Sequence, residues 1–551
     1  MVLIQGKGVS KGVAAGPLYF YQRGGAEIVR TQIEDTEAEL ARFEEARQTA
    51  MTQLQELYEK ALAEVGEESA ALFEAHQMML EDMDYVEGIQ DVIGSGVNAE
   101  AAVMEVAEQF AEMLLAMDDE YMQGRAADVK DISTRVVAIL SGAVAGGIDS
   151  EVPVILAADD LAPSETVQLD KSKILGFVTS GGSGNSHTAI LARTMGIPAI
   201  IGVGEKLKEA YSGKDVIIDG ETGEVAVEAD EITSERLLKK QAKERALKEL
   251  LDQLKGQPNI TIDGKKVMVY CNIGSPDDLD AVLANDGGGV GLFRSEFLYL
   301  QNDTYPTEEQ QFRAYKTAAE RMGGKRVIIR TLDIGADKQA DYFQLEKEEN
   351  PAMGLRAIRI CLTRPEVFKT QLRALYRASV YGKIAIMFPM ITSVWEVREI
   401  KRICQAVQAE LRAEEIPFDE QVELGIMIET PASVMMSDQL AKEVDFFSVG
   451  TNDLTQYTLA VDRQGNNLDR FFDAHHPAVL RMIKQAADNA HKAGIWLGIC
   501  GELGADTSLT ETFLAIGVDE LSVSPSAVLP LRSVIRSIDT RKNSEEILAN
   551  L

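Results

Sequence analysis

The 551-residue sequence has few cysteines, no long apolar run and a deficit of positive charge. Its four cysteines (Cys271, Cys361, Cys404 and Cys500) are far apart and form no CxxC pair, which predicts reduced thiols in a cytoplasmic protein. No segment approaches the roughly 18 consecutive apolar residues of a membrane-spanning helix, and the first residues lack the apolar core of a signal peptide. Lys and Arg number 55 against 88 Asp and Glu. With a net charge of −33, we expect neither nucleic-acid binding nor binding to an anionic membrane surface, and the lack of a long apolar run predicts no membrane insertion.

The order of sequence patterns predicts several domains. Residues 1–30 and 145–229 contain short β-patterns, and a continuous helical pattern over 31–144 separates them. We interpret the two flanks as one α/β domain and the helical stretch as a subdomain inserted into it. The charged stretch 230–257, which ends in Gly-Gln-Pro, predicts a helical linker.

The helical stretch carries most of the negative charge. Residues 34–131 hold 26 Asp and Glu against five Lys and Arg, a local net charge of −21. A solvated face of a helical bundle would account for much of this charge. Because the charge is concentrated in one block, it also indicates a docking surface for a cationic protein partner.

From residue 258 to 551, short apolar strands alternate with amphipathic helices. Eight strands are predicted, starting near residues 267, 289, 326, 383, 424, 446, 496 and 520. Eight strands in about 260 residues are close to the roughly 250 residues typical of a (β/α)8 TIM barrel. In such barrels the active site lies at the carboxyl ends of the strands, so catalytic and binding residues are expected there.

Charged side chains follow several of these strands. Glu429 and Asp453, with Asn452 adjacent, follow successive strands, and two carboxylates there would suit Mg2+. Each carboxylate alone could instead be an ion-pair partner. Arg294 and Arg330 leave neighbouring strands, and arginine forks bind phosphate and carboxylate groups.

Three further residues extend this pattern. Arg463 follows ten residues after Asp453. Arg356, in NPAMGLRAIR, is another candidate for anion binding. Together the arginines indicate a small phosphorylated anion, although a single arginine is more often part of a surface salt bridge. Cys500 ends a strand, where a thiol could serve as a general acid or only fill the core.

A glycine-rich loop in TSGGSGNSHTAILARTMGIPAI carries the sharpest local pattern. A predicted strand leads into the loop, and Ser186-His187-Thr188 then opens a short helix. A helix N-terminus carries roughly +0.5 elementary charge, which disfavours a protonated imidazole there and leaves His187 a neutral nucleophile. An isolated histidine is usually structural, and the loop alone could merely bind an anion. A Mg2+ and phosphate site in the barrel would supply a phosphoryl donor.

Seven motifs resemble enzyme I of the bacterial sugar phosphotransferase system: GGSGNSHTAILAR, GLFRSEFLYL, RTLDIGADK, NPAMGLRAIRI, IMIETPAS, SVGTNDLTQYTLAVDR and GICGELGAD. They occur in the same order over essentially the whole chain. The resemblance implies a swivelling phosphohistidine α/β domain with a helical insertion that binds the phosphocarrier protein HPr. It also implies a barrel that binds phosphoenolpyruvate and forms a homodimer. The implied reaction transfers the phosphoryl group from phosphoenolpyruvate to a histidine of the enzyme, releasing pyruvate, and then to HPr.

The resemblance also implies residue roles. The nucleophile, through its tele nitrogen, would be His187, and the proton donor that forms pyruvate would be Cys500. The substrate-binding residues would be Arg294, Arg330, Asn452, Asp453 and Arg463, with Arg356 as a further candidate. The Mg2+ ligands would be Glu429 and Asp453, and Thr166 would orient the histidine. The family loop often reads GGRTSHT, whereas GGSGNSHT here lacks the basic residue and is one residue longer.

Three alternatives remain open at this point. Phosphoenolpyruvate synthase and pyruvate phosphate dikinase share the histidine domain and barrel, but they need a large ATP-binding domain, and no GxxxxGK[ST] loop is present. A regulatory adaptor with a degenerate barrel would bind metabolites without turnover. The nitrogen-related paralogue of enzyme I is expected to carry a GAF-like segment, which we do not find before the helical stretch.

Overall fold

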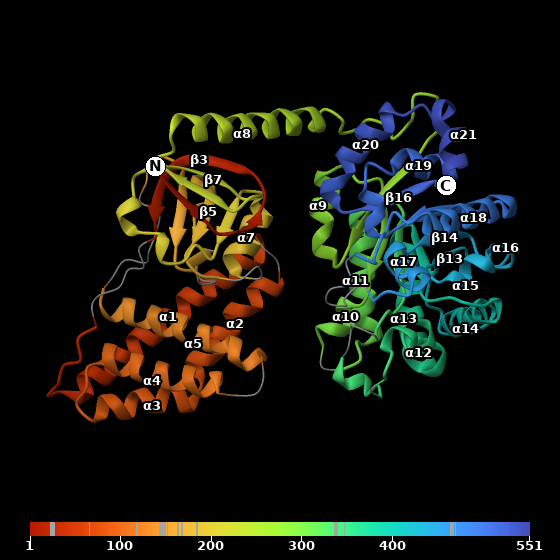
Figure 1. Cartoon of the computed structure of the whole chain (residues 1–551). Helices are drawn as coiled ribbons and strands as arrows, with labels where there is room; N and C mark the ends of the chain where they lie inside the picture. Colours follow the sequence, from red (N-terminus) through yellow and green to blue (C-terminus); the bar gives the residue numbers. More distant parts are fainter. Residues whose placement is uncertain are drawn as a thin grey trace. The chain divides into compact units, whose positions relative to one another are not determined.

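The computed structural model describes residues 1–21, 28–64, 67–116, 120–142, 150, 152–161, 165–166, 169–182, 186–302, 304–335, 340–346, 348–462, 468 and 470–551. The chain forms two compact units, Met1–Leu247 and Lys248–Leu551 (Figure 1). Arg463 and the loop residues 183–185 lie outside the described residues.

The first unit contains a sheet of eight strands in the order β1-β8-β7-β3-β4-β5-β6-β2. Strands β3 and β4 pair in parallel, with Leu18 opposite Ile155, although the helical stretch separates them in sequence. The sheet therefore combines strands from both sides of that stretch, as the predicted fold class requires. The strands are β1 (Val2–Gln5), β2 (Lys7–Ser10), β3 (Val13–Phe20), β4 (Val154–Ala158), β5 (Ile174–Thr179), β6 (Ala199–Ile201), β7 (Asp215–Asp219) and β8 (Glu224–Val227).

The helical stretch packs around a hydrophobic core of its own. Phe43, Leu54, Ile89, Val103 and Val136 are buried in this core, which is distinct from the cores on the sheet. The apolar positions recur three or four residues apart along each helix, so one face of each helix is buried. The helices are α1 (Thr36–Glu64), α2 (Glu67–Glu81), α3 (Met83–Gly94), α4 (Ala99–Leu115) and α5 (Glu120–Leu140), coloured red to orange in Figure 1.

Two more helices of the first half of the chain have distinct environments. Helix α7 (His187–Met195) ends at Gly196, whose φ of 64° is the left-handed conformation that glycine adopts readily. Helix α8 (Glu231–Asp252) is mostly exposed, and the division between the two units falls within it. Lys240 holds this helix to the sheet through ion pairs of 2.8 Å with Asp219 and with Glu221.

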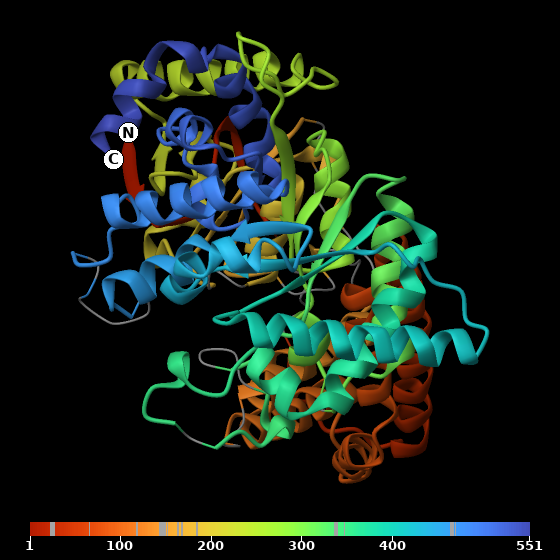
Figure 2. The same ribbon diagram turned by 90° about the vertical axis from the view of Figure 1, so that its right-hand side faces the viewer.

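The second unit is a closed barrel of eight parallel strands (Figure 2). All eight predicted strands are confirmed. Most of them are buried on both faces, which explains why they read as continuous apolar runs in the sequence, whereas buried and partly buried residues alternate along the first barrel strand. The strands are β9 (Met268–Ile273), β10 (Val290–Arg294), β11 (Val327–Arg330), β12 (Ile384–Phe388), β13 (Glu423–Ile428), β14 (Phe446–Val449), β15 (Trp496–Ile499) and β16 (Glu520–Val523).

Helices follow the barrel strands and cover the outside of the barrel. They are α9 (Leu279–Ala284), α10 (Phe297–Leu300), α11 (Glu308–Arg321), α12 (Ile358–Thr363), α13 (Pro365–Ala378), α14 (Val394–Ala413), α15 (Pro431–Met435), α16 (Ser437–Leu440), α17 (Thr451–Leu459), α18 (Pro477–Ala493), α19 (Thr510–Ile516), α20 (Val528–Ser537) and α21 (Thr540–Asn550). None of the helices in the described part of the chain is long and apolar enough to cross a membrane.

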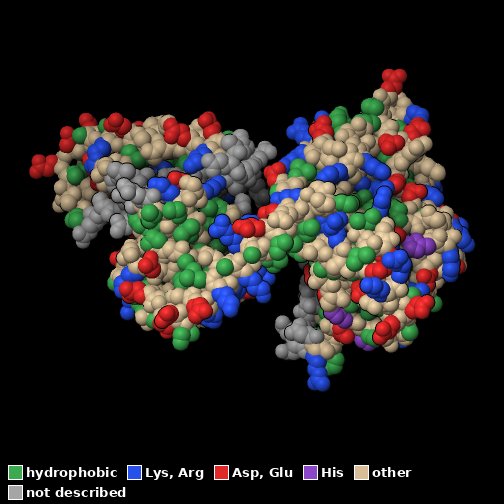
Figure 3. Space-filling model, turned by 90° about the horizontal axis from the view of Figure 1, so that it is seen from above, with side chains coloured by type: hydrophobic (Ala, Val, Ile, Leu, Met, Phe, Trp, Pro, Cys, Tyr) green, Lys and Arg blue, Asp and Glu red, His purple; other side chains and the backbone are tan. Residues whose placement is uncertain are grey.

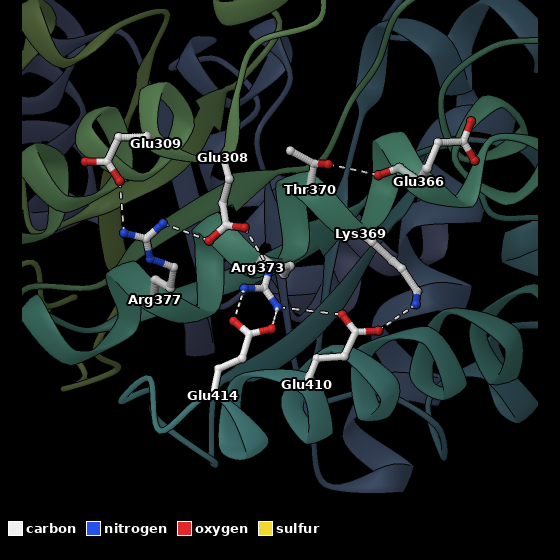
Figure 4. Close-up of polar contacts among 9 residues, drawn as sticks. All are labelled: Glu308, Glu309, Glu366, Lys369, Thr370, Arg373, Arg377, Glu410 and Glu414. Carbon is white, nitrogen blue, oxygen red and sulfur yellow. Dashed lines mark hydrogen bonds and ion pairs between the residues drawn. The ribbon is translucent and has the colours of Figure 1, made fainter.

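Ion pairs join neighbouring outer helices of the barrel (Figure 4). Arg373 on α13 contacts Glu308 on α11 at 2.7 Å and Glu414, next to the end of α14, at 2.6 Å. Lys369 on α13 contacts Glu410 on α14 at 2.7 Å. On the face seen in Figure 3, basic and acidic side chains are interspersed over the barrel unit. Pairs of this partly exposed kind contribute modestly to stability.

Candidate active site

The carboxyl ends of the barrel strands surround a cavity of about 610 Å³. This is the end of a TIM barrel at which active sites are built. Six of the predicted site residues line the cavity: Arg294, Arg330, Glu429, Asn452, Asp453 and Cys500. Arg294 and Arg330 end neighbouring strands and lie opposite each other in the parallel register, as expected from their positions in the sequence.

Two buried arginines share one network of carboxylates. Arg330 pairs with Glu296 and, through Nη1, with Asp333 Oδ2 at 3.1 Å. Arg356 places Nη2 3.0 Å from Asp333 Oδ1 and Nη1 3.1 Å from Asp453 Oδ1. Burial acts to lower the pKa of both arginines, but the surrounding carboxylates more than offset it and raise the pKa above its ordinary value. Both guanidinium groups therefore stay charged.

Glu429 lies in the same cavity and is suited to hold a cation. Its Oε1 accepts a 2.6 Å hydrogen bond from the backbone N–H of Met390, a residue with the unusual φ of 58°. A side chain at Gly450 would lie 2.7 Å from Glu429 Oε2, so glycine there leaves that oxygen room for a ligand. Burial, followed by repulsion from Asp453 and Asp333, raises the pKa of Glu429 to about 8.

The two carboxylates of Glu429 and Asp453 fit a divalent cation at this position. In the described part of the chain, no three His, Cys, Asp or Glu side chains gather as a metal site. A cation bound here would therefore take two protein carboxylates and fill its remaining positions with substrate oxygens and water, which is typical of Mg2+. Burial and, after it, repulsion from the neighbouring carboxylates raise the pKa of Glu429, and a bound cation would offset that repulsion.

Asn452 and Asp453 differ from the prediction in their local structure. We expected them at the end of a strand, but β14 ends at Val449 and both residues lie in the first turn of α17. The strand and the helix are separated by a single residue, Gly450. The N-terminus of this nine-residue helix is thus at the barrel mouth, where its backbone N–H groups favour an anion.

Cys500 directly follows β15 and is buried at the cavity. Its thiol donates to the carbonyl oxygen of Val449 at 3.6 Å. Burial raises the pKa of this thiol to about 12, although the hydroxyl of Ser448 partly offsets the shift. The group is therefore a protonated thiol at neutral pH, which suits a proton donor better than a nucleophile.

The first unit carries the predicted histidine. As expected, His187 begins helix α7, and the side chain of Ser186 caps the helix by accepting from the N–H of Ala189 at 3.4 Å. Thr188 Oγ1 lies 3.2 Å from Asp160 Oδ1, which anchors the first turn to the segment after β4. Thr166 is buried in the same unit.

The sequence reasoning did not assign roles to Asp333 and Glu296. Asp333 joins two arginines from different parts of the chain, and Glu296 pairs with one of them. The sequence did contain a pattern that could have indicated these ion pairs, because each acid follows an arginine by two or three residues at a strand end. Tyr457, whose hydroxyl accepts from Arg356 at 3.2 Å, gave no such signal.

Comparison with known proteins agrees with this architecture. The family described as PEP-utilising enzymes matches the chain in three parts: the PEP-binding domain at residues 248–540, the N-terminal part at 5–125 and the mobile domain at 151–223. The chain is thus a PEP-utilising enzyme.

Curated relatives narrow this class to one family. The chain is 43% identical to the phosphoenolpyruvate-protein phosphotransferase of Priestia megaterium, over 97% of this chain and 94% of the relative. The proteins of the same name from Bacillus subtilis (41% identity, 98% and 95% covered) and Haemophilus influenzae (43%, 98% and 94%) are similar over the same extent. The chain belongs to the phosphoenolpyruvate-protein phosphotransferase family, which confirms the resemblance found in the sequence.

Proposed function

We propose that this enzyme transfers the phosphoryl group of phosphoenolpyruvate to its own His187 and then to the phosphocarrier protein HPr. The product of the first step is pyruvate, and the two steps open the sugar phosphotransferase system. The observation that carries the proposal is the barrel cavity of about 610 Å³, which brings two arginines, two carboxylates and a protonated thiol together. Family membership supports the same reaction.

The arginines are suited to bind the substrate. Arg294 is exposed at the end of β10, and Arg330 is fixed beside it by its carboxylate partners. Guanidinium forks bind phosphate and carboxylate oxygens bidentately, and phosphoenolpyruvate carries both groups. Arg356 positions Asp453 through their 3.1 Å ion pair. Asn452 would add a backbone N–H, and Arg463 is proposed as a further substrate ligand from the family motif alone.

The family uses a divalent metal ion, and we propose Mg2+ held by Glu429 and Asp453. When bound, Mg2+ supplies positive charge to the phosphoryl and enolate oxygens. Glu429 is kept in place by the N–H of Met390, and Asp453 by Arg356. These contacts orient both carboxyl groups before the substrate arrives.

Cys500 is the proposed acid that completes the first step. When the phosphoryl group leaves, the remaining enolate needs a proton at carbon to become pyruvate. A thiol with a pKa near 12 carries that proton throughout the physiological range. The tele nitrogen of His187 is the proposed acceptor of the phosphoryl group, because the helix N-terminus disfavours a protonated ring. Thr166 is proposed to orient that ring.

The partner and assembly proposals rest on the sequence and the family. Residues 34–131, with a net charge of −21, suit a basic docking face on HPr. We propose that residues 31–144 form the HPr-binding subdomain, and that 1–30 and 145–229 form the histidine domain. This domain would swing about the linker 230–257 to meet the substrate at the barrel of 258–551. A homodimer through the barrel and a cytoplasmic location are proposed on the same grounds.

The test is phosphoryl transfer from labelled phosphoenolpyruvate in the presence of Mg2+. Wild-type protein is expected to gain an acid-labile label, and His187→Ala is expected to gain none. The matched control is His475→Ala, which removes an exposed histidine paired with Asp506 at 2.7 Å on the barrel unit. A label that persists in His187→Ala would refute the proposed acceptor, and ATP as the only effective donor would refute the proposed substrate.

A further inference from the structure

A cluster of buried polar side chains inside the barrel has no role in the mechanism above. Glu520, the first residue of β16, is fully buried, and neither of its carboxyl oxygens has a hydrogen-bond partner among the described residues. The hydroxyl of Ser522 and the side-chain oxygen of Asn272 are buried and unpartnered within the same part of the chain, and the buried hydroxyl of Ser448 interacts with the thiol of Cys500. A buried polar group without a partner destabilises the fold, so folding stability does not explain the cluster.

The strand register places this cluster next to Cys500. Gly498 on β15 lies opposite Ser448 on β14 and opposite Glu520 on β16. Side chains two residues apart on a strand face the same side, so Cys500 shares the barrel interior with Gly498. Cys500 lines the cavity at the barrel mouth, and Glu520 and Ser448 therefore flank the position directly below it.

Glycine leaves the space that the carboxyl group of Glu520 occupies. A side chain at Gly498 would lie 1.9 Å from Glu520 Oε2. A side chain at Gly291 on β10 would lie 2.4 Å from Glu520 Oε1 and 2.4 Å from Ser522 Oγ. Two strands thus lack side chains where the carboxyl group and the Ser522 hydroxyl converge. A small polar space of this kind, with several unpartnered oxygens, also suits buried water.

The surroundings of Glu520 favour a neutral carboxylic acid. Burial raises its pKa well above the ordinary value, and Arg326 opposes this shift only in part. Arg326 is itself bound to Glu423, with 2.9 Å between Nη2 and Oε1. The protonated form of Glu520 is thus favoured by burial, in the barrel layer below the thiol that the proposed reaction deprotonates.

We propose that Glu520 restores the proton that Cys500 gives to the enolate. The inference rests on the proposed role of Cys500 as the donor. In the first step the S–H bond of Cys500 breaks and a C–H bond of pyruvate forms, leaving a thiolate. The carboxyl proton of Glu520 then passes to the thiolate through the hydroxyls of Ser522 and Ser448, and the Glu520 carboxylate takes a proton from water. Glu520 acts through Cys500 and does not touch the substrate.

The decisive variant is Glu520→Gln, which keeps the shape of the neutral acid and removes its transferable proton. Pyruvate is measured by rapid quench in the first turnover and in the steady state, with phosphoenolpyruvate, Mg2+ and HPr. We expect a first turnover within about twofold of wild type and a steady-state rate about tenfold lower, because only later turnovers need a new proton. The steady-state rate of the variant is also expected to fall more in D2O than that of wild type.

Controls separate this role from a structural one. Glu410→Gln alters a carboxyl group on the outer helix α14, one that pairs with Lys369, and should leave the ratio of the two rates unchanged. An infrared band of a protonated carboxyl group, present in wild type and lost in Glu520→Gln, would support the inference. An unchanged steady-state rate in Glu520→Gln, or an equal fall in both phases, would overturn it. Cys500→Ala tests the underlying assignment separately, because a normal first turnover in that variant would refute the thiol as donor.

Discussion

The barrel mouth and the N-terminus of helix α7, the two proposed sites of phosphoryl transfer, are built from different kinds of contacts. At the barrel mouth, Arg330 and Arg356 are buried charges held by Glu296, Asp333 and Asp453. At α7, the contacts at the first turn include a serine cap and a threonine–aspartate pair. In the proposed reaction the barrel site would supply positive charge to the substrate, whereas the N-terminus of α7 would favour a neutral imidazole at His187.

The largest effect is expected from breaking the barrel network. Arg330→Met leaves Glu296 and Asp333 buried without this counter-ion, so the free energy of barrel unfolding should fall by about 3–5 kcal/mol. The value of kcat/KM should fall by about 10³-fold or more, because the anion site loses a guanidinium group. Denaturant unfolding and steady-state kinetics measure the two effects. The control Arg313→Met removes a largely exposed arginine on α11 and should change neither, so equal losses in both variants would contradict the prediction.

The second prediction concerns the thiol at the barrel mouth. Cys500→Ala should lower kcat by about 10²–10⁴-fold with little change in KM, because proton donation is lost while substrate binding stays. Cys404, buried on α14, is a matched control because its thiol pKa is also raised to about 12 by burial. Cys404→Ala should therefore leave kcat nearly unchanged.

Since an acid with a pKa near 12 stays protonated below that value, the wild-type rate should show no loss from thiol ionisation between pH 7 and 9. Such a loss would count against Cys500.

A smaller effect is expected at the acceptor helix. Ser186→Ala removes the cap of α7, which should destabilise its first turn by about 1 kcal/mol and slow phosphorylation of His187 several-fold. Quench-flow measurement of the phosphorylated protein reports the rate. Thr307→Ala removes an equivalent cap on α11, where Thr307 accepts from the N–H of Gln310 at 3.2 Å. This control should lose similar stability without slowing phosphorylation, and an equal slowing would show that capping at α7 has no special role.

The smallest effect concerns the attachment of α8 to the sheet, and it depends on pH. Burial alone would raise the pKa of Asp219, but hydrogen bonds from Lys240 and from two backbone N–H groups lower it overall. A lowered carboxyl pKa stabilises the fold at neutral pH, and this contribution disappears as the pH falls through the folded value. Lys240→Met should therefore cost about 1 kcal/mol at pH 7 and much less at strongly acidic pH. Thermal unfolding at both pH values tests this, with Lys214→Met at an exposed pair as the control.

Much of the barrel could be predicted because its strands are buried runs with polar ends. Ile384–Phe388 is buried throughout, and Arg294 and Arg330 end consecutive strands, so their proximity follows from chain order. The bridging role of Asp333 could not be predicted, because it depends on where the chain before α12 returns to the barrel.

The start of α17 and the surroundings of Glu520 could not be predicted, because they depend on local backbone geometry that the spacing of apolar residues does not reveal. The start of α17 at Thr451 requires the chain to turn at one glycine, Gly450, which moved Asn452 and Asp453 from a strand end to a helix. The contact between Glu520 and Gly498 depends on the register of two strands. In the sequence, Glu520 is only an acid at the beginning of an apolar strand.

The parallel pairing of β3 and β4 has a consequence for the helical insertion. Parallel neighbours run in the same direction, so the chain leaving β3 at Phe20 must cross the full length of the sheet before it enters β4 at Val154. The helices α1 to α5 are therefore the crossover connection of a β-α-β unit, enlarged into a folded body. A shortened chain without them would still need a bridging segment of about a dozen residues or more to keep this strand order. Direct splicing of the two strand ends should yield a different sheet.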